Sequence, residues 1–118
     1  MEVAENFRTE LALALDLLAE DEWAITKARE RTIDKIEQPH IAFESIVPVL
    51  NLAIEQQDEY AFMSCCWLAL QLAQKANTTE LPIKLPETLQ SLTLFSARFS
   101  PAALNEVNAV EKWFSINI

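Results

Sequence analysis

The sequence of 118 residues contains no glycine, where average usage of about 7% would place about eight. Glycine takes positive φ at no steric cost and lets backbone lie against a phosphate. Its absence excludes glycine-rich phosphate loops, the GxGxxG dinucleotide turn and the GxSxG nucleophile elbow. It also disfavours two-residue β-hairpins, which depend on Asn-Gly, Asp-Gly or Gly-Gly. Helices tolerate a glycine-free sequence best, so we expect an all-α fold.

Cysteine and histidine are scarce, which limits metal and redox chemistry. Cys65 and Cys66 are adjacent, so on a helix they point about 100° apart, and no CxxC motif exists. Glu37 and the single histidine, His40, have the ExxH spacing of di-iron bundles, but Pro39 interrupts the helix that this motif needs. We therefore predict no metal and no cofactor, and we expect both thiols in the core of a protein from a reducing compartment.

Long apolar runs and signal-peptide features are missing as well. The longest apolar-rich stretch, 60–73, has 14 residues, fewer than the roughly 20 that span a bilayer. The first five residues include two acids and no base, unlike the positively charged start of a secretory signal. We expect a cytoplasmic protein with no membrane partner.

Basic residues are outnumbered two to one, 9 against 18 acidic residues. Residues 1–60 hold 14 acidic and 5 basic residues, whereas residues 61–118 hold four of each, so the first half carries the whole net charge of −9. Phosphate backbones would be repelled by that half, and nucleic-acid binding is therefore disfavoured.

The apolar residues that are present recur at helical spacing and predict six helices in one domain. We expect them at about 3–19, 22–37, within 41–56, and at about 59–76, 86–98 and 101–114. They pair as three stacked antiparallel hairpins at about 3–37, 41–76 and 86–114, in a short α-solenoid or a helical bundle.

Residues suited to helix ends support these bounds. Asp21 and Asp58 are good N-caps for the second and fourth helices, and Asn77 can take the left-handed residue after the fourth. The third helix either begins at a Ser45 cap or is kinked at Pro48. The segment 78–85 is a connector expected to lay its apolar side chains over neighbouring helices. The fourth helix is apolar almost all round, which predicts the centre of the core.

An internal repeat supports the hairpins. Residues 21–25, Asp-Glu-Trp-Ala-Ile, match residues 58–62, Asp-Glu-Tyr-Ala-Phe, at a spacing of 37. Periods of 20–50 residues are typical of stacked helical hairpins. With Val47-Pro48-Val49-Leu50 and Asp58 ahead of a helix of small and apolar residues, the chain resembles HEAT and armadillo repeats. This resemblance covers one hairpin well and implies an α-solenoid-like stack that binds proteins; the arginine that HEAT repeats often carry early in the second helix is missing.

No group of residues indicates catalysis. Glu30, Asp34 and Glu37 share a stripe of the second helix, but bases interleave with them, as on a solvated face. Cys65 and Cys66 have no cation or base nearby in sequence to activate a thiolate. We expect a protein that is not an enzyme; an enzyme built on carboxylates alone is a disfavoured rival and would need Glu30, Asp34 or Glu44 buried and facing one another.

A group of acidic residues is the main candidate site. Because the first two hairpins repeat one another, their bends should emerge at the same edge and gather six acidic side chains, which we name the acidic rim: Glu20, Asp21, Glu22, Glu55, Asp58 and Glu59. Trp23 and Tyr60 lie beside it. Helix capping explains some of these acids, and the two aromatics could be packed into the core. Capping does not explain Glu20 and Glu55, which follow helix ends where negative charge is disfavoured.

These features favour a non-enzymatic protein-binding module whose acidic rim meets a basic partner protein. By size, charge and expected fold, the chain resembles small acidic immunity proteins, which neutralise bacterial toxins, and the resemblance implies neutralising or sequestering a partner. The alternative is an adaptor or chaperone for a secreted effector that uses an apolar groove. The apolar end at residues 113–118 could pack on its own core, bind that partner or form a homodimer.

Overall fold

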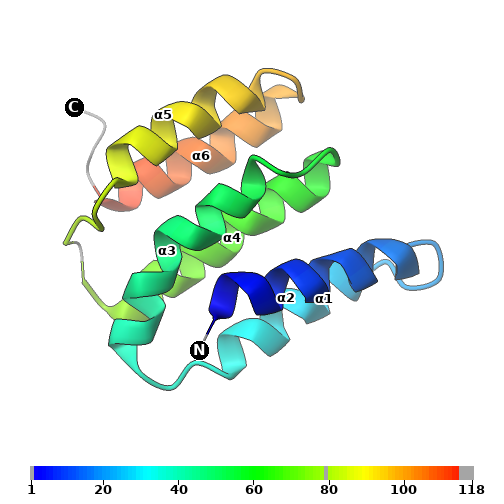
Figure 1. Ribbon diagram of the computed structural model, residues 1–118. Helices are drawn as coiled ribbons and strands as arrows, with labels where there is room; N and C mark the ends of the chain where they lie inside the picture. Colours follow the sequence, from blue (N-terminus) through cyan, green and yellow to red (C-terminus); the bar gives the residue numbers. More distant parts are fainter. Residues whose placement is uncertain (1, 79, 115–118) are drawn as a thin grey trace.

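The computed structural model describes residues 2–78 and 80–114 of the chain. Within them lie six α-helices and no strand: α1 (Val3–Leu17), α2 (Ala24–Asp34), α3 (Pro39–Ala53), α4 (Glu59–Ala76), α5 (Leu85–Ser96) and α6 (Pro101–Phe114). Consecutive helices form three antiparallel hairpins that stack side by side (Figure 1). The all-α prediction is confirmed.

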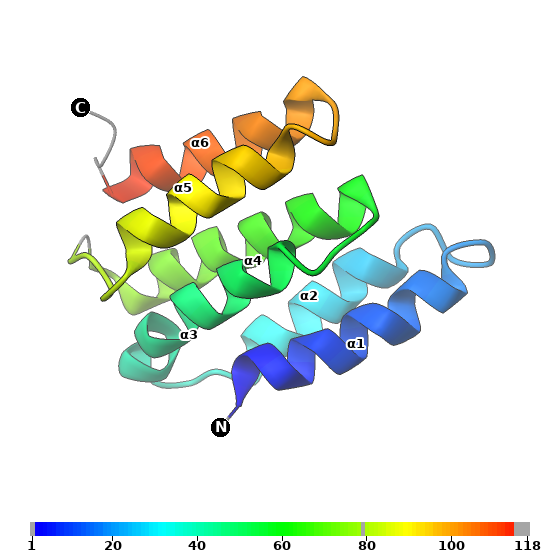
Figure 2. The same ribbon diagram turned by 45° about the horizontal axis from the view of Figure 1, so that its top comes forward.

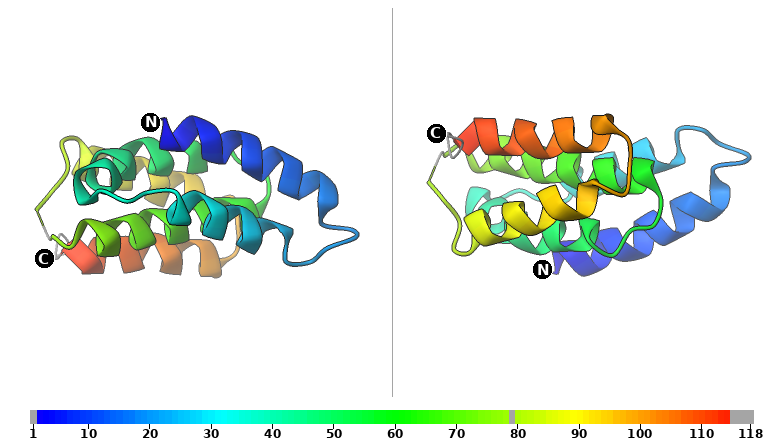
Figure 3. Two further views of the ribbon diagram at one scale, coloured as in Figure 1. Left: turned by 90° about the horizontal axis from the view of Figure 1, so that it is seen from below. Right: turned by 90° about the horizontal axis from the view of Figure 1, so that it is seen from above.

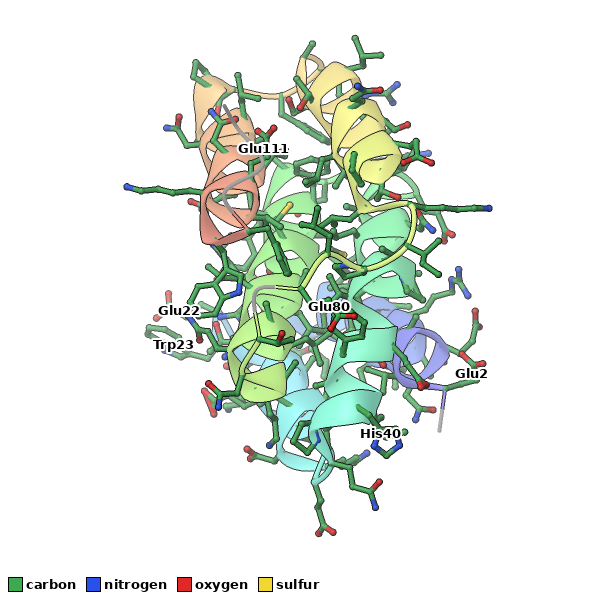
Figure 4. The ribbon with its side chains drawn as sticks, turned by 90° about the vertical axis from the view of Figure 1, so that its left-hand side faces the viewer. Glu2, Glu22, Trp23, His40, Glu80 and Glu111 are labelled. Carbon is green, nitrogen blue, oxygen red and sulfur yellow. The ribbon has the colours of Figure 1, made fainter. Side chains whose placement is uncertain are left out.

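The hairpins stack as two layers of three helices each. α1, α3 and α5 form one layer, and α2, α4 and α6 form the other, as the end-on view shows (Figure 4). The Cα atoms extend over 41 × 34 × 17 Å, and the shortest dimension fits two helices packed about 8–10 Å apart. The stack therefore has two broad faces, which we name the α1/α3/α5 face and the α2/α4/α6 face.

The central hairpin holds most of the core. α4 buries ten residues, including Phe62, Cys65, Cys66 and Leu68, because α3, α2 and α6 all pack against it (Figure 2). Phe62 also contacts Phe95 and Phe99, with ring centroids 5.9 and 5.3 Å away. These rings join the third hairpin to the second. The prediction that the fourth helix is the centre of the core is confirmed, although its outer side, with Tyr60 and Trp67, stays partly exposed.

Two predicted helix ends are confirmed in detail. The Asp58 carboxylate accepts a 2.8 Å hydrogen bond from the Ala61 backbone N–H at the start of α4. Asn77 has φ 56° and ψ 43°, the left-handed conformation, and its N–H reaches the carbonyl oxygens of Ala73 and Gln74. Asparagine stands here in place of the usual glycine.

Other predicted ends are wrong. α2 begins at Ala24 rather than directly after Asp21, because the Asp21 side chain accepts from the Trp23 N–H and closes a turn ahead of the helix. α3 begins at Pro39, whose fixed φ suits a first helical position, so Ser45 lies inside the helix and its hydroxyl donates to the Ile41 carbonyl. Pro48 also lies inside α3.

The connector before α5 only partly covers the helices. Pro82 and Leu85 are buried, but Ile83 is 87% exposed and Leu81 47%. Lys84, in the left-handed region with φ 71°, turns the chain into α5. The prediction that this segment lays its apolar side chains over neighbouring helices therefore holds for Pro82 and Leu85 and is wrong for Leu81 and Ile83. No helix in the described part of the chain is both long and apolar enough to cross a bilayer.

Candidate functional site

The bends of all three hairpins lie at one end of the stack, and the links between hairpins lie at the other (Figure 1). The 20–22 and 57–59 bends therefore emerge at the same end, as the repeat predicts. The first bend projects beyond the other two (Figure 3). We name this projecting bend, residues 18–23, the hairpin tip.

Four of the six acidic side chains of the rim form hydrogen bonds or ion pairs with other residues of the chain. The Glu55 carboxylate pairs with the Arg8 guanidinium of α1 at 2.8 and 3.1 Å. Glu59 accepts the Ser100 N–H at 3.0 Å and also its hydroxyl. Asp58 caps α4. These contacts join the second bend to the first and third hairpins. The ion pair with Arg8 explains the position of Glu55, which helix capping does not explain.

Asp21 is the fourth acid of the rim with partners in the chain. One carboxylate oxygen accepts the Trp23 N–H at 3.0 Å, and the other lies 2.8 Å from the Lys27 Nζ. The hydrogen bond from Lys27, followed by that from Trp23, lowers the pKa of Asp21. Asp21 therefore shapes the hairpin tip and carries a partly neutralised charge.

The remaining two acids precede an exposed tryptophan. Glu20 and Glu22 are exposed and take part in none of the ion pairs found among the described residues. The Trp23 side chain is 59% exposed, and it projects with Glu22 from the α2/α4/α6 face (Figure 4). Trp23 is thus not packed into the core, whereas Tyr60, 37% exposed, rests edge-on against Trp67. The rim therefore divides into a second bend that ties hairpins together and a hairpin tip that faces solvent.

Sequence reasoning missed a second group of side chains on the α2/α4/α6 face. Arg29 of α2 lies over the Trp67 ring of α4, 5.1 Å from its centroid, and the Trp67 indole N–H donates to Glu106 of α6. One signal was available: Arg29 follows Ile25 by four residues, which puts a cation beside the buried stripe of α2. Trp67 gave no such signal inside an apolar run.

The residues considered for catalysis or metal binding are either exposed or inert. Glu30, Asp34, Glu37, Glu44 and His40 are exposed, so the burial that carboxylate catalysis would need is not found for these acids. Burial raises the pKa of the Cys66 thiol to about 12 and that of Cys65 further, which keeps both protonated. Among the described residues, no three His, Cys, Asp or Glu side chains come together as a metal site would need.

An apolar groove runs between α5 and α6 on the outer side of the third hairpin. Its volume is about 450 Å³, and its lining includes Leu89, Leu94 and Glu111. Leu94 is 79% exposed. Near this groove α6 ends with half-buried Trp113 and buried Phe114; residues 115–118 of the predicted apolar terminus lie outside the described residues.

Comparisons of the chain with protein-family models, with curated proteins and with solved structures found no match.

Proposed function

We propose that this chain is a non-enzymatic protein-binding module that sequesters or neutralises a partner protein with a basic surface. What supports the proposal is the hairpin tip, where a tryptophan 59% exposed follows the exposed acids Glu20 and Glu22. Leaving this indole largely in water forgoes part of the roughly 1.5–3 kcal/mol that full burial of a large apolar side chain gains. Tryptophan is also enriched among the residues that dominate binding energy.

The charge of the first half fits a basic partner. Its net charge of −9 would speed the approach of a positively charged protein and repel acidic ones. We assign binding to Glu20 and Glu22 of the rim and to Trp23 next to them, and Tyr60, which is 37% exposed, remains a further candidate. Asp21, Glu55, Asp58 and Glu59 hold the bends in place through the contacts described above.

Neutralisation of a toxin is the role that the resemblance to immunity proteins implies for such a module. A partner with a basic active-site cleft would offer positive charge to the negatively charged hairpin tip. Likewise, the two-layer stack of hairpins is in keeping with the resemblance to HEAT and armadillo repeats, whose faces bind proteins.

The test compares charge reversal at the two ends of the stack. The variant E20K/E22K changes the hairpin tip, and E37K/E80K makes the same change in charge in the links at the opposite end. We expect wild-type protein and the E37K/E80K control to retain a basic partner from a lysate of the source cell. With that partner purified, we expect E20K/E22K to slow association at low salt about tenfold or more, and Trp23→Ala to weaken binding by about 1–2 kcal/mol. Equal association by both charge variants would refute the proposal.

The α5–α6 groove favours a second candidate, an adaptor or chaperone for a secreted effector. A leucine 79% exposed at an apolar groove is a surface that an apolar segment of another protein could cover. Leu94→Glu separates the two functions. It should abolish binding of a partner segment in the α5–α6 groove and leave binding of a partner at the hairpin tip unchanged.

A further inference from the structure

One row of side chains crosses all three helices of the α2/α4/α6 face. Arg29 lies over one side of the Trp67 ring, Tyr60 meets that ring edge-on at 5.5 Å, and Glu106 accepts the indole N–H. The three hairpins thus bring a cation, an aromatic ring and an anion together on one face. All four side chains are partly exposed, so another molecule can reach them.

Arg29 lacks the carboxylate partner that Arg8 and Arg31 have. Arg8 is paired with Glu55 and Glu5, and Arg31 with Glu10. No ion pair among the described residues includes Arg29, and its one hydrogen bond is a long contact of 3.5 Å to the Ser64 hydroxyl. A guanidinium has five N–H donors, so most of its capacity is unused.

This incomplete pairing matters because Arg29 is half-buried. Loss of water around the guanidinium lowers the pKa of Arg29, with Tyr60 and Glu30 opposing that effect from nearby. A partly desolvated cation is costly unless an anion approaches it. The Trp67 ring supplies part of that compensation through a cation–π contact, but a ring face cannot accept the two parallel hydrogen bonds that a carboxylate accepts from a guanidinium.

We propose that Arg29 anchors a side-chain carboxylate of a partner polypeptide that crosses the α2/α4/α6 face, with an apolar side chain of that partner against the exposed part of Trp67 and a basic one at Glu106. The occupant follows from charge complementarity: a surface that presents cation, aromatic and anion in order matches a segment with acidic, apolar and basic side chains in order.

The proposal rests on the proposed function and adds one acidic residue to the basic partner that the hairpin tip attracts. Trp23 projects from the same face (Figure 4), so a single partner can touch the tip with basic side chains and reach Arg29 with an acidic one. Tryptophan, tyrosine and arginine are the residue types most enriched at the centres of interfaces, and all three are present here.

The test uses defined peptides rather than the natural partner. The probe is acetyl-Glu-Ala-Leu-Ala-Lys-amide, and its match carries Gln in place of Glu. Binding is followed by the NMR signals of the Arg29 Nε–H and the Trp67 indole N–H of the full chain, which report millimolar affinities. We expect the Glu peptide to bind about tenfold or more tightly than the Gln peptide, because charge-assisted pairs exceed neutral ones.

Two variants show whether Arg29 carries that preference. Arg29→Gln should reduce the ratio of the two affinities to about one, as in a double-mutant cycle. Arg98→Gln is the matched control, since Arg98 also lies over an aromatic ring, Phe95, but is exposed on another hairpin; it should leave the ratio unchanged. A dispersed Trp67 indole signal in each variant verifies that the chain is folded.

Several results would overturn the anchor. These are equal binding of the two peptides, no shift of either signal at millimolar peptide, or a preference for Glu that survives Arg29→Gln. A third peptide, the Gln version with a free carboxyl end, distinguishes the source of the carboxylate: if it binds as tightly as the Glu peptide, a chain terminus is recognised and the side-chain assignment is wrong. If the peptides fail while E20K/E22K still slows association, the proposed function stands without the anchor.

Discussion

Acidic residues at the bends make different contacts although they have similar places in the repeat. Asp21 and Asp58 occupy equivalent positions, yet only Asp58 has an extended backbone next to a helix and accepts the N–H of the third helical residue. Asp21 accepts from an N–H two residues ahead and joins Lys27. The difference arises from two further turn residues before α2, which the repeat does not reveal.

The Asp58 cap has a measurable effect on stability. Asp58→Ala should lower the free energy of unfolding by about 1 kcal/mol, because one N–H at the start of α4 loses its acceptor. Urea unfolding followed by tryptophan fluorescence gives the value. Asp16→Ala is the control, since Asp16 is an exposed carboxylate near the end of α1 and its loss should cost nothing. Equal destabilisation by both variants would contradict the capping role.

The two buried thiols make stability depend on alkaline pH. The ordinary thiol pKa is 9.0, and burial raises that of Cys66 to about 12 and that of Cys65 further. Above about pH 9 the unfolded chain loses these protons while the folded chain keeps them, so the free energy of unfolding falls as pH rises toward 12. The expected slope is about 1.4 kcal/mol per thiol for each pH unit.

The variant C65A/C66A isolates this contribution. It should be less stable at neutral pH, because two packed side chains shrink, yet its free energy of unfolding should fall less steeply between about pH 9 and pH 11. Urea titrations at several pH values compare the slope of the wild-type protein with that of the variant. Lysine and tyrosine titrate in both proteins and contribute to both slopes alike. Parallel slopes would mean that the thiols are not shielded in the folded state.

Sequence reasoning predicted the structure best at the scale of whole helices. Apolar periodicity placed all six, and α6 was predicted with the bounds that it has, 101–114. Their ends were harder, because Pro39 reads equally as a stop signal for one helix and as the first residue of the next. Competition of this kind is resolved by tertiary packing, which a single sequence does not display.

The candidate site was predictable only in part for the same reason. The repeat placed the acids at bends on one edge, but pairing depends on contacts between distant residues: Arg8 meets Glu55 across 47 positions, and Ser100 meets Glu59 across 41. Nor could Trp67 be distinguished from the apolar residues around it, since its exposure depends on how α2 and α6 flank α4. Long-range pairing thus decided which acids remain free of contacts within the described part of the chain.

Pro48 is the one feature of α3 that opposes its helix. It lies inside α3 and is exposed, so residue 48 cannot donate to the Glu44 carbonyl one turn earlier. Pro48→Ala should raise the free energy of unfolding by about 1–3 kcal/mol, less whatever the proline saves in the unfolded chain. The change is measured in urea.

Pro39→Ala is the matched control in the same helix. Pro39 stands at the first turn, where no helical hydrogen bond is lost, so its replacement should leave stability unchanged or slightly lower. If the two alanine variants behave alike, Pro48 must be compensated by packing that its exposure does not reveal.

The whole molecule is a stack in which only the central hairpin has neighbours on both sides. α3–α4 is covered by the first hairpin on one side and by the third on the other (Figure 2), whereas α1–α2 and α5–α6 each have one free side. Stability in such arrays is the sum of what each hairpin contributes and what it gains from its neighbours. The hairpin tip and the α5–α6 groove both belong to these less supported units, where binding surfaces are to be expected.

Hydrogen exchange should reveal this gradient across the stack. The backbone amides of α4 should exchange most slowly, because ten of its residues are buried and opening it breaks contacts with both other hairpins. Those near the hairpin tip should exchange fastest among the bends, since this bend projects beyond its neighbours (Figure 3). Mass spectrometry of peptides from the deuterated chain measures the order, with α2 and α6 as internal references from the same layer. Exchange in α2 or α6 as slow as in α4 would indicate that the three hairpins open as one unit, and the tip would then owe its exposure to shape alone and not to weaker support.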